Sequence, residues 1–199
     1  MTTMAQNYIF GYGSLIDTHN RSLTLPHSRE IYPVTIKNFQ RQWNVRSNLR
    51  SFTVLGVTPQ SGHECTGLIF PVSPEELEEL DFRERSYQRQ TIFPSNILSF
   101  SQKKNIPQKS VWTYIPNSPQ FPSQNNPITQ TYLDLVLRGC LEINEEFARQ
   151  FIRTTPWHSY WINDRTQPRT HHLLNNPQLE QHIDTLLQQE IPAYFTQRI

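Results

Sequence analysis

The pattern of apolar residues changes once along the chain, and this change constrains the fold more than any other feature. Up to residue 115, short β-rich runs alternate with turn residues, as is typical of strands. After a Pro- and Asn-rich stretch at 116–127, apolar residues recur every three or four positions, as is typical of helices. Strands precede helices, so the sequence predicts an α+β fold. The 199 residues fit a single domain, 1–199, in which 116–199 form a loop and a helical C-terminal part.

The predicted strands are residues 8–10, 31–43, 52–57, 64–72, 88–93, 96–100 and 110–115, and the turn at 59–62 separates the third from the fourth. The predicted helices after the loop are 129–138, 144–153 and 178–191, and Gly139 is expected to end the first of them. Residues 155–172 are expected to be irregular. Residues 18–30 and 116–127 are expected to be variable surface loops.

The charge of the chain is nearly balanced. The formal net charge is +1 and no long run of one sign occurs, which argues against nucleic acid or an anionic membrane as partner. No stretch approaches the ~18 apolar residues of a membrane span, and the N-terminal residues do not read as a signal peptide. Cys65 and Cys140 lie far apart in no metal or redox spacing, so we expect reduced core thiols in a cytoplasmic protein. The oligomeric state is not predicted.

A glycine-rich loop follows the first predicted strand. Two of the 6 glycines, Gly11 and Gly13, lie within the stretch FGYGSL at 10–15. Glycine lets a chain turn sharply and approach a ligand closely, and successive backbone N–H groups at such a turn can bind an anion. A carboxylate fits better than a phosphate, which usually comes with a longer loop and a lysine. The spacing is also compatible with an ordinary turn between a strand and a helix.

A further helix is predicted from about residue 74 to about residue 85. Ser73 and Glu76 match a capping box, and Pro74 suits the first helical turn. The acidic residues of the first turns fall largely away from the apolar stripe and are expected to be solvated.

Glu84 lies on the apolar face of this predicted helix. Leu77, Leu80 and Glu84 stand at i, i+3 and i+7, on one face. Partial burial raises the pKa of a carboxyl group and makes its carboxylate a better proton acceptor near neutral pH. Two alternatives stay open: Glu84 pairs with neighbouring arginines such as Arg83 at a fraying helix end, or Asp81 is the buried carboxylate.

These segments resemble the γ-glutamylcyclotransferase family. YIFGYGSLI at 8–16 is similar to the opening of these enzymes, including the branch that acts on glutathione. GLIFPVSPEELEELDFRERSYQR at 67–89 resembles their second signature, in which a strand leads into a helix that ends in Leu-Asp-x-x-Glu. SVWTYI at 110–115 is similar to the family strand that carries a pocket tyrosine. The three motifs keep the family order between residues 8 and 115.

The resemblance implies a small mixed β-barrel-like sheet with flanking helices. It also implies an enzyme that converts a γ-glutamyl compound into 5-oxoproline and the released amine by intramolecular attack of the α-amine. No cofactor and no metal take part. The site residues that it implies are Glu84 as catalytic base and Tyr12, Gly13, Ser14, Leu15 and Tyr114 as substrate-binding residues. Tyr87 resembles the family tyrosine after the glutamate, but its spacing varies in the family, so it is not assigned a role.

Alternative interpretations concern whether the protein is an enzyme, which substrate it uses and whether it binds a metal. A non-catalytic module that binds a glutamyl compound or 5-oxoproline is the alternative to an enzyme. The glutathione branch usually has a tryptophan after YGSLI, where this chain has Asp17, so glutathione is less well supported than the reaction itself. The pair His171–His172, with His158 and His182, lacks the spacing of metal ligands. Residues 161–165 either anchor the C-terminal tail or close one side of the pocket.

Overall fold

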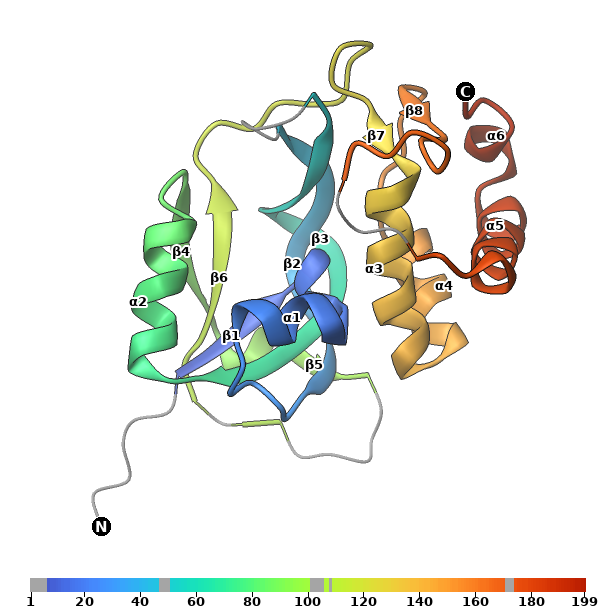
Figure 1. Ribbon diagram of the computed structural model, residues 1–199. Coiled ribbons are helices and arrows are strands. Elements are labelled where there is room, and N and C mark those ends of the chain that lie inside the picture. Colours follow the sequence, from blue (N-terminus) through green and yellow to red (C-terminus); the bar gives the residue numbers. More distant parts are fainter. Residues whose placement is uncertain (1–6, 47–50, 101–105, 108, 171–173) are drawn as a thin grey trace.

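The computed structural model describes residues 7–46, 51–100, 106–107, 109–170 and 174–199. A curled sheet forms one part of the molecule, and a group of helices packs beside it (Figure 1). The strands are β1 (Asn7–Gly11), β2 (Tyr32–Arg46), β3 (Thr53–Val72), β4 (Tyr87–Ile92), β5 (Ile97–Ser99), β6 (Val111–Pro116), β7 (Ile128–Thr129) and β8 (Trp161–Ile162). The helices are α1 (Thr18–Thr24), α2 (Pro74–Arg83), α3 (Gln130–Ile143), α4 (Glu145–Arg153), α5 (Pro177–Glu190) and α6 (Pro192–Phe195), with short 3₁₀ turns η1 (Ser14–Ile16) and η2 (Pro94–Asn96).

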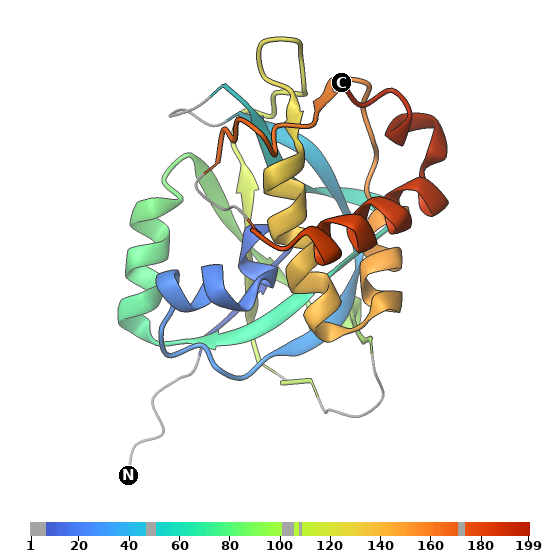
Figure 2. The ribbon, with the colours of Figure 1, turned by 45° about the vertical axis from the view of Figure 1, so that its right-hand side comes forward.

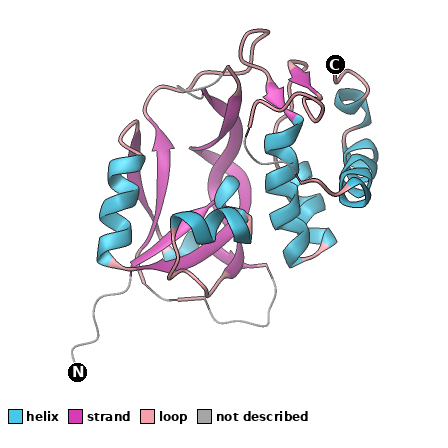
Figure 3. Ribbon diagram, viewed as in Figure 1, coloured by secondary structure: helices cyan, strands magenta, loops and turns pink. Residues whose placement is uncertain are grey.

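The sheet is mixed, which confirms the predicted α+β class. Its order is β4-β6-β1-β3-β2-β5, and β7 extends it between β3 and β8. β1 pairs antiparallel with β3 and parallel with β6. Figure 3 shows the strands curling together on one side and most of the helices gathered on the other. Apart from α1 and α2, the helices lie in the C-terminal part of the chain, as the pattern of apolar residues predicts, and among the strands only the two-residue β8 comes after α3 and α4.

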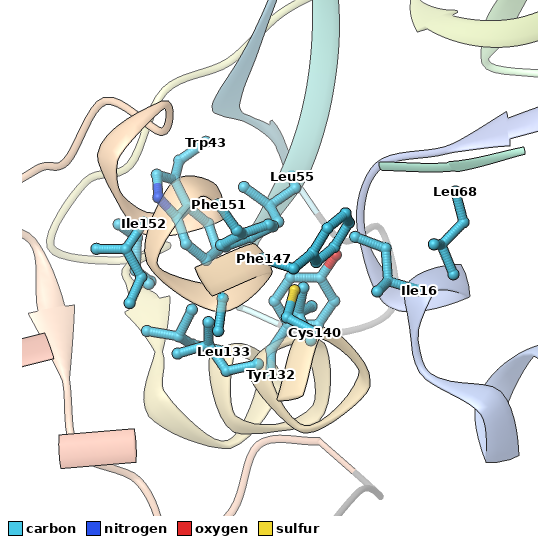
Figure 4. Packing of buried hydrophobic residues seen from close by; sticks show 14 of the residues in the cluster. Ile16, Trp43, Leu55, Leu68, Tyr132, Leu133, Cys140, Phe147, Phe151 and Ile152 are labelled. Atoms are coloured by element: carbon cyan, nitrogen blue, oxygen red, sulfur yellow. The ribbon is translucent and has the colours of Figure 1, made fainter. Parts of the chain in front are cut away.

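β1 is buried on both faces, which explains its run of apolar residues. Ile9 joins a cluster of apolar side chains that includes the helices, while Tyr8 and Phe10 join a second cluster formed by the strands. Figure 4 shows part of the first cluster, where Tyr132 of α3 lies close to Cys140 and Phe147.

The predicted turn at residues 59–62 is wrong. β3 runs without interruption from Thr53 to Val72, so the third and fourth predicted strands are one strand. The turn-forming residues lie in an irregularity of the β2–β3 ladder, where Lys37 pairs with Glu64 but Phe39 pairs with Pro59. Gly62 has φ +76° there, a left-handed conformation that glycine adopts easily, so these residues bulge without ending the strand.

The prediction that Gly139 ends a helix is also wrong. α3 continues to Ile143, and Gly139 lies inside it, packed against the backbone of Ile16 and Asp17. The glycine therefore serves close approach between α3 and the segment after η1, because a side chain would not fit between them. Figure 2 shows α3 between the sheet and α5.

The segment expected as a loop at 18–30 begins with α1. Asp17 caps this helix by accepting a hydrogen bond from the backbone N–H of Asn20, at 2.7 Å. The fully buried Asp17 carboxylate also binds Arg138 of α3 through two hydrogen bonds, 2.6 and 2.8 Å long. One side chain thus fixes both the start of α1 and its position against α3.

Residues 161–165 anchor the C-terminal part. The Asp164 carboxylate accepts hydrogen bonds from the backbone and hydroxyl of Thr131, and Arg165 binds Asp134 and Asp184. These contacts support the structural interpretation of this segment. In the part of the chain that the structure describes, no helix has both the length and the apolar character needed to span a bilayer.

Candidate active site

A cavity of about 320 Å³ opens beside the end of β1. It is bounded by the loop after β1, the start of β3, the C-terminal end of α2, and tyrosines from β4, β6 and α3. Its lining residues are Ile9, Phe10, Gly11, Tyr12, Gly13, Ser14, Leu15, Val54, Leu55, Arg83, Glu84, Tyr87, Tyr114 and Tyr132. Each residue that the sequence points to as a catalytic or substrate-binding group is in this set.

The loop after β1 is shaped by two close approaches. A Cβ atom on Gly11 would lie 2.9 Å from the ring of Phe70, and one on Gly13 would lie 3.0 Å from the hydroxyl of Tyr132. The chain turns directly after Gly13, whose carbonyl accepts a hydrogen bond from the N–H of Ile16 at 2.9 Å. Glycine is therefore required because aromatic side chains touch the backbone on this wall of the cavity.

Glu84 reaches the cavity from the end of α2. The predicted capping box is confirmed: Ser73 accepts from the N–H of Glu76 at 3.1 Å, and Glu76 accepts from the N–H of Ser73 at 2.9 Å. The helix ends at Arg83, slightly before the predicted end, and Glu84 is its C-cap, with its N–H donating to Leu80 at 2.8 Å. The cap thus fixes where α2 starts, and its length places Glu84 against the loop.

The Glu84 side chain is largely buried, with 21% of its surface exposed. Desolvation by burial raises the pKa of this carboxyl group, and the positive charge of Arg83 partly offsets the rise. Arg83 Nε lies 3.4 Å from Glu84 Oε1, and its Nη1 donates to the Thr24 hydroxyl of α1 at 2.9 Å. Both interpretations of Glu84 thus hold in part, because it faces a cavity and also pairs with Arg83.

Asp81 is not the buried carboxylate. Its side chain is 41% exposed and does not line the cavity. It accepts a hydrogen bond from the Tyr114 hydroxyl at 2.7 Å and binds Arg89 at 2.5 Å. The residue therefore holds the Tyr114 ring in the cavity wall, which leaves Glu84 as the carboxylate that faces the cavity.

Tyrosine side chains surround Glu84. The Tyr12 hydroxyl donates to the carbonyl of Tyr114 at 2.8 Å, which ties the loop to β6. Desolvation raises the pKa of the hydroxyl groups of Tyr12, Tyr87, Tyr114 and Tyr132. The pKa of Tyr132 rises to about 12, and backbone hydrogen bonds with Leu55 and Ser14 partly offset this rise. These hydroxyls are neutral at pH 7 and supply polar, uncharged surface. The backbone of Ser14 is engaged with Tyr132, so the loop and this hydroxyl act together.

Tyr132, Arg83, Val54 and Leu55 are cavity residues that the sequence did not single out. Tyr132 lies on the apolar stripe of the helix predicted at 129–138, and it belongs to the core as well as to the cavity wall. A buried tyrosine needs a partner for its hydroxyl, and this requirement was the available signal. Tyr87, which the sequence left without a role, also lines the cavity.

The histidines and cysteines considered as metal ligands or reactive groups do not line the cavity where the structure describes them. His182 sits 3.4 Å from Glu145 on the surface of α5, and His158 packs beside Phe121. His171 and His172 are outside the described residues. Within the described ranges no group of three His, Cys, Asp or Glu side chains could hold a metal ion. Cys65 and Cys140 are buried free thiols.

A family model described as "Gamma-glutamyl cyclotransferase, AIG2-like" matches residues 9–134, a range that contains the loop, α2 and β6. No curated protein matches the sequence. A solved structure described as "Gamma-glutamyl cyclotransferase" has a TM-score of 0.62 and 16% identity, covering 90% of this chain and 99% of its own. The structure of an uncharacterized protein from Homo sapiens has a TM-score of 0.62 and 17% identity, covering 89% of this chain and 98% of its own. The structure of YkqA from Bacillus subtilis has a TM-score of 0.57 and 16% identity, covering 74% of this chain and 53% of its own. At these identities the structures show a shared fold.

Proposed function

The chain belongs to the AIG2-like gamma-glutamyl cyclotransferase family, and we propose that it converts a γ-glutamyl compound into 5-oxoproline and the released amine. The observation that carries the proposal is the single cavity that contains both Glu84 and the loop of Tyr12, Gly13, Ser14 and Leu15. These groups come from distant parts of the sequence. A desolvated carboxylate that shares a cavity with a loop able to present N–H groups to an anion suits a substrate that carries an ammonium group and a carboxylate on one carbon.

In the proposed reaction the substrate attacks itself. Glu84 accepts a proton from the α-ammonium, and the freed amine attacks the γ-carbonyl carbon, so that a C–N bond closes the five-membered ring. The original amide C–N bond then breaks, and Glu84 returns its proton to the departing nitrogen. After ring closure the ring nitrogen still carries two hydrogens. Once Glu84 has returned the first proton, it accepts one of these two and passes it to the released amine. The ring nitrogen thus keeps one of its three hydrogens, and the amine leaves as an ammonium ion.

The raised pKa of Glu84 suits both halves of this cycle. A carboxylate whose pKa lies above its usual range is a stronger base toward the ammonium, and its acid form is available to the leaving amine. The loop and Tyr114 would hold the glutamyl part in its folded conformer. Such positioning supplies effective molarities up to about 10⁵–10⁸ M in favourable intramolecular reactions.

The test is release of 5-oxoproline, measured by mass spectrometry. The panel contains glutathione, γ-glutamyl dipeptides and γ-glutamylamines. It therefore compares leaving amines that carry a carboxylate, which Arg83 in the cavity wall could attract, with leaving amines that do not. Glu84→Gln should lose about 10²- to 10⁴-fold in kcat, the contribution typical of general acid–base catalysis. Glu79→Gln, on the exposed side of the same helix, is the matched control and should keep full activity.

Two results would count against the proposal. Full activity of Glu84→Gln would remove Glu84 from the proton transfer. A wild-type protein that binds 5-oxoproline but releases none from any member of the panel would instead be a binding module on this fold.

A further inference from the structure

Arg41 is a completely buried arginine on β2. Its guanidinium stacks on Phe151, with Cζ 3.7 Å from the ring centroid. All its hydrogen-bond acceptors are neutral oxygens. They are the carbonyls of Tyr12, Thr66 and Phe151 and the hydroxyls of Thr66, Thr154 and Thr155. The guanidinium, with five N–H donors, is therefore fully hydrogen-bonded but not neutralised.

No carboxylate among the described residues pairs with Arg41. Arg138 and Arg165 do have such partners, in Asp17 and Asp134. Arg21 is also buried and donates only to neutral oxygens, but the negative charges of Glu142 and Asp17 act on it. No carboxylate charge of the described ranges acts on Arg41 in this way. Burial lowers the pKa of Arg41, yet an arginine stays protonated at neutral pH. A buried charge without an opposite charge is costly to the fold. Packing alone therefore does not explain why the chain has an arginine at position 41.

The contact to Tyr12 connects this charge to the cavity. Arg41 Nη1 donates to the Tyr12 carbonyl at 3.3 Å. In the trans peptide between Tyr12 and Gly13 the carbonyl and the N–H point in opposite directions, so the Gly13 N–H points away from Arg41. Both residues line the cavity. An anion that accepts from this N–H would lie roughly 8 Å from the guanidinium, on the opposite side of one peptide group.

We propose that Arg41 is a positioning residue that turns the Tyr12–Gly13 peptide toward the cavity and supplies the charge that selects an α-carboxylate in the substrate. This inference rests on the proposed function, and the substrate's carboxylate is the counter-charge that the protein itself does not provide. It predicts that the site discriminates a γ-glutamyl compound from its γ-aminobutyryl counterpart, which has the same amine and the same scissile amide but no carboxylate.

The test compares these two compounds. The γ-glutamyl substrate that the wild type turns over is paired with its γ-aminobutyryl counterpart, which cyclises to 2-pyrrolidinone, and the ratio of kcat/KM is measured. Arg41→Lys keeps the charge with fewer hydrogen bonds, while Arg41→Gln keeps donors without the charge. At roughly 8 Å and an effective dielectric constant near 20, loss of the charge should lower the ratio about 10- to 30-fold, mainly through KM for the γ-glutamyl compound. The ratio in Arg41→Lys should stay close to that of the wild type.

A purely structural role would lower kcat/KM for both compounds by the same factor, so an unchanged ratio in Arg41→Gln overturns the inference. If neither variant folds, the wild type still decides it, because 5-oxoproline should bind at least tenfold more tightly than neutral 2-pyrrolidinone. Equal affinities overturn the inference. Failure of the proposed function is a different observation, namely no product from any γ-glutamyl compound with the wild type.

Discussion

Replacement of Gly139 by alanine tests whether contact between α3 and the loop shapes the cavity. A Cβ atom at this position would lie 2.5 Å from Asp17 Cα and 2.7 Å from the carbonyl carbon of Ile16, and closer still to the Asp17 nitrogen. Carbon atoms normally pack at about 3.5–4.0 Å, so α3 and this segment must separate by roughly 1 Å. The obstructing atoms are backbone, so no rotamer change relieves the contact.

The expected loss of stability follows from two opposing effects. Overpacking of this kind costs about 1–3 kcal/mol, while alanine gains about 1 kcal/mol over glycine inside a helix. The free energy of unfolding should therefore fall by at most about 2 kcal/mol. The same separation moves Ser14, whose backbone is hydrogen-bonded to Tyr132, relative to that side chain in the cavity wall. A shift of about 1 Å can cost a factor of about 10² in rate, so kcat/KM should fall 10- to 100-fold.

Urea unfolding and the 5-oxoproline assay measure the two effects. Gly62→Ala is the matched control, because Gly62 has φ +76° and no neighbour within 4 Å of its Cβ position. That variant should lose about 1–2 kcal/mol through backbone strain and keep its kcat/KM, since Gly62 does not line the cavity. If Gly139→Ala unfolds at the wild-type urea concentration with unchanged kcat/KM, the reasoning about this contact is refuted.

Four further substitutions give separate tests. Arg83→Gln removes the charge that holds down the pKa of Glu84, so the acid limb of kcat/KM should move to higher pH; no movement would contradict the ion pair. Because burial raises the pKa of folded Glu84 above its unfolded value of 4.5, Glu84→Gln should unfold at higher urea than wild type at pH 7, a gain that disappears below about pH 4.5; a constant difference would refute it. Asp17→Ala leaves Arg138 unpaired and α1 uncapped, so the free energy of unfolding in urea should fall by roughly 2–3 kcal/mol. A fall of less than about 1 kcal/mol would show that the Asp17–Arg138 pair behaves as a solvated one. Ser73→Ala should cost about 1 kcal/mol in the same measurement, and no loss would show that its cap contributes nothing.

Local signals in the sequence predicted the elements that carry the candidate site. The capping box of Ser73 and Glu76 fixed the start of α2, and the apolar stripe of Leu77 and Leu80 placed Glu84 toward the interior. Both signals act within a few residues, so they do not depend on the rest of the fold. The glycines at 11 and 13 marked the loop for the same reason.

The errors arose where distant segments decide the local structure. Gly139 has the sequence character of a helix end, but contact with Asp17 retains it inside α3. The turn-forming residues at 59–62 bulge within a strand because β2 continues to pair on both sides of them. Tyr132 is a core residue, but nothing near it in sequence shows that its hydroxyl also meets the loop after β1.

The hydroxyl groups around Glu84 resist ionisation far into the alkaline range. Burial raises the pKa of Tyr12, Tyr87, Tyr114 and Tyr132. Above neutral pH the tyrosine hydroxyls of the cavity wall therefore stay uncharged, while the α-ammonium group of the substrate loses its proton. An alkaline inflection in kcat/KM would report the α-ammonium of the substrate, and its position would follow the amine pKa from one γ-glutamyl compound to the next.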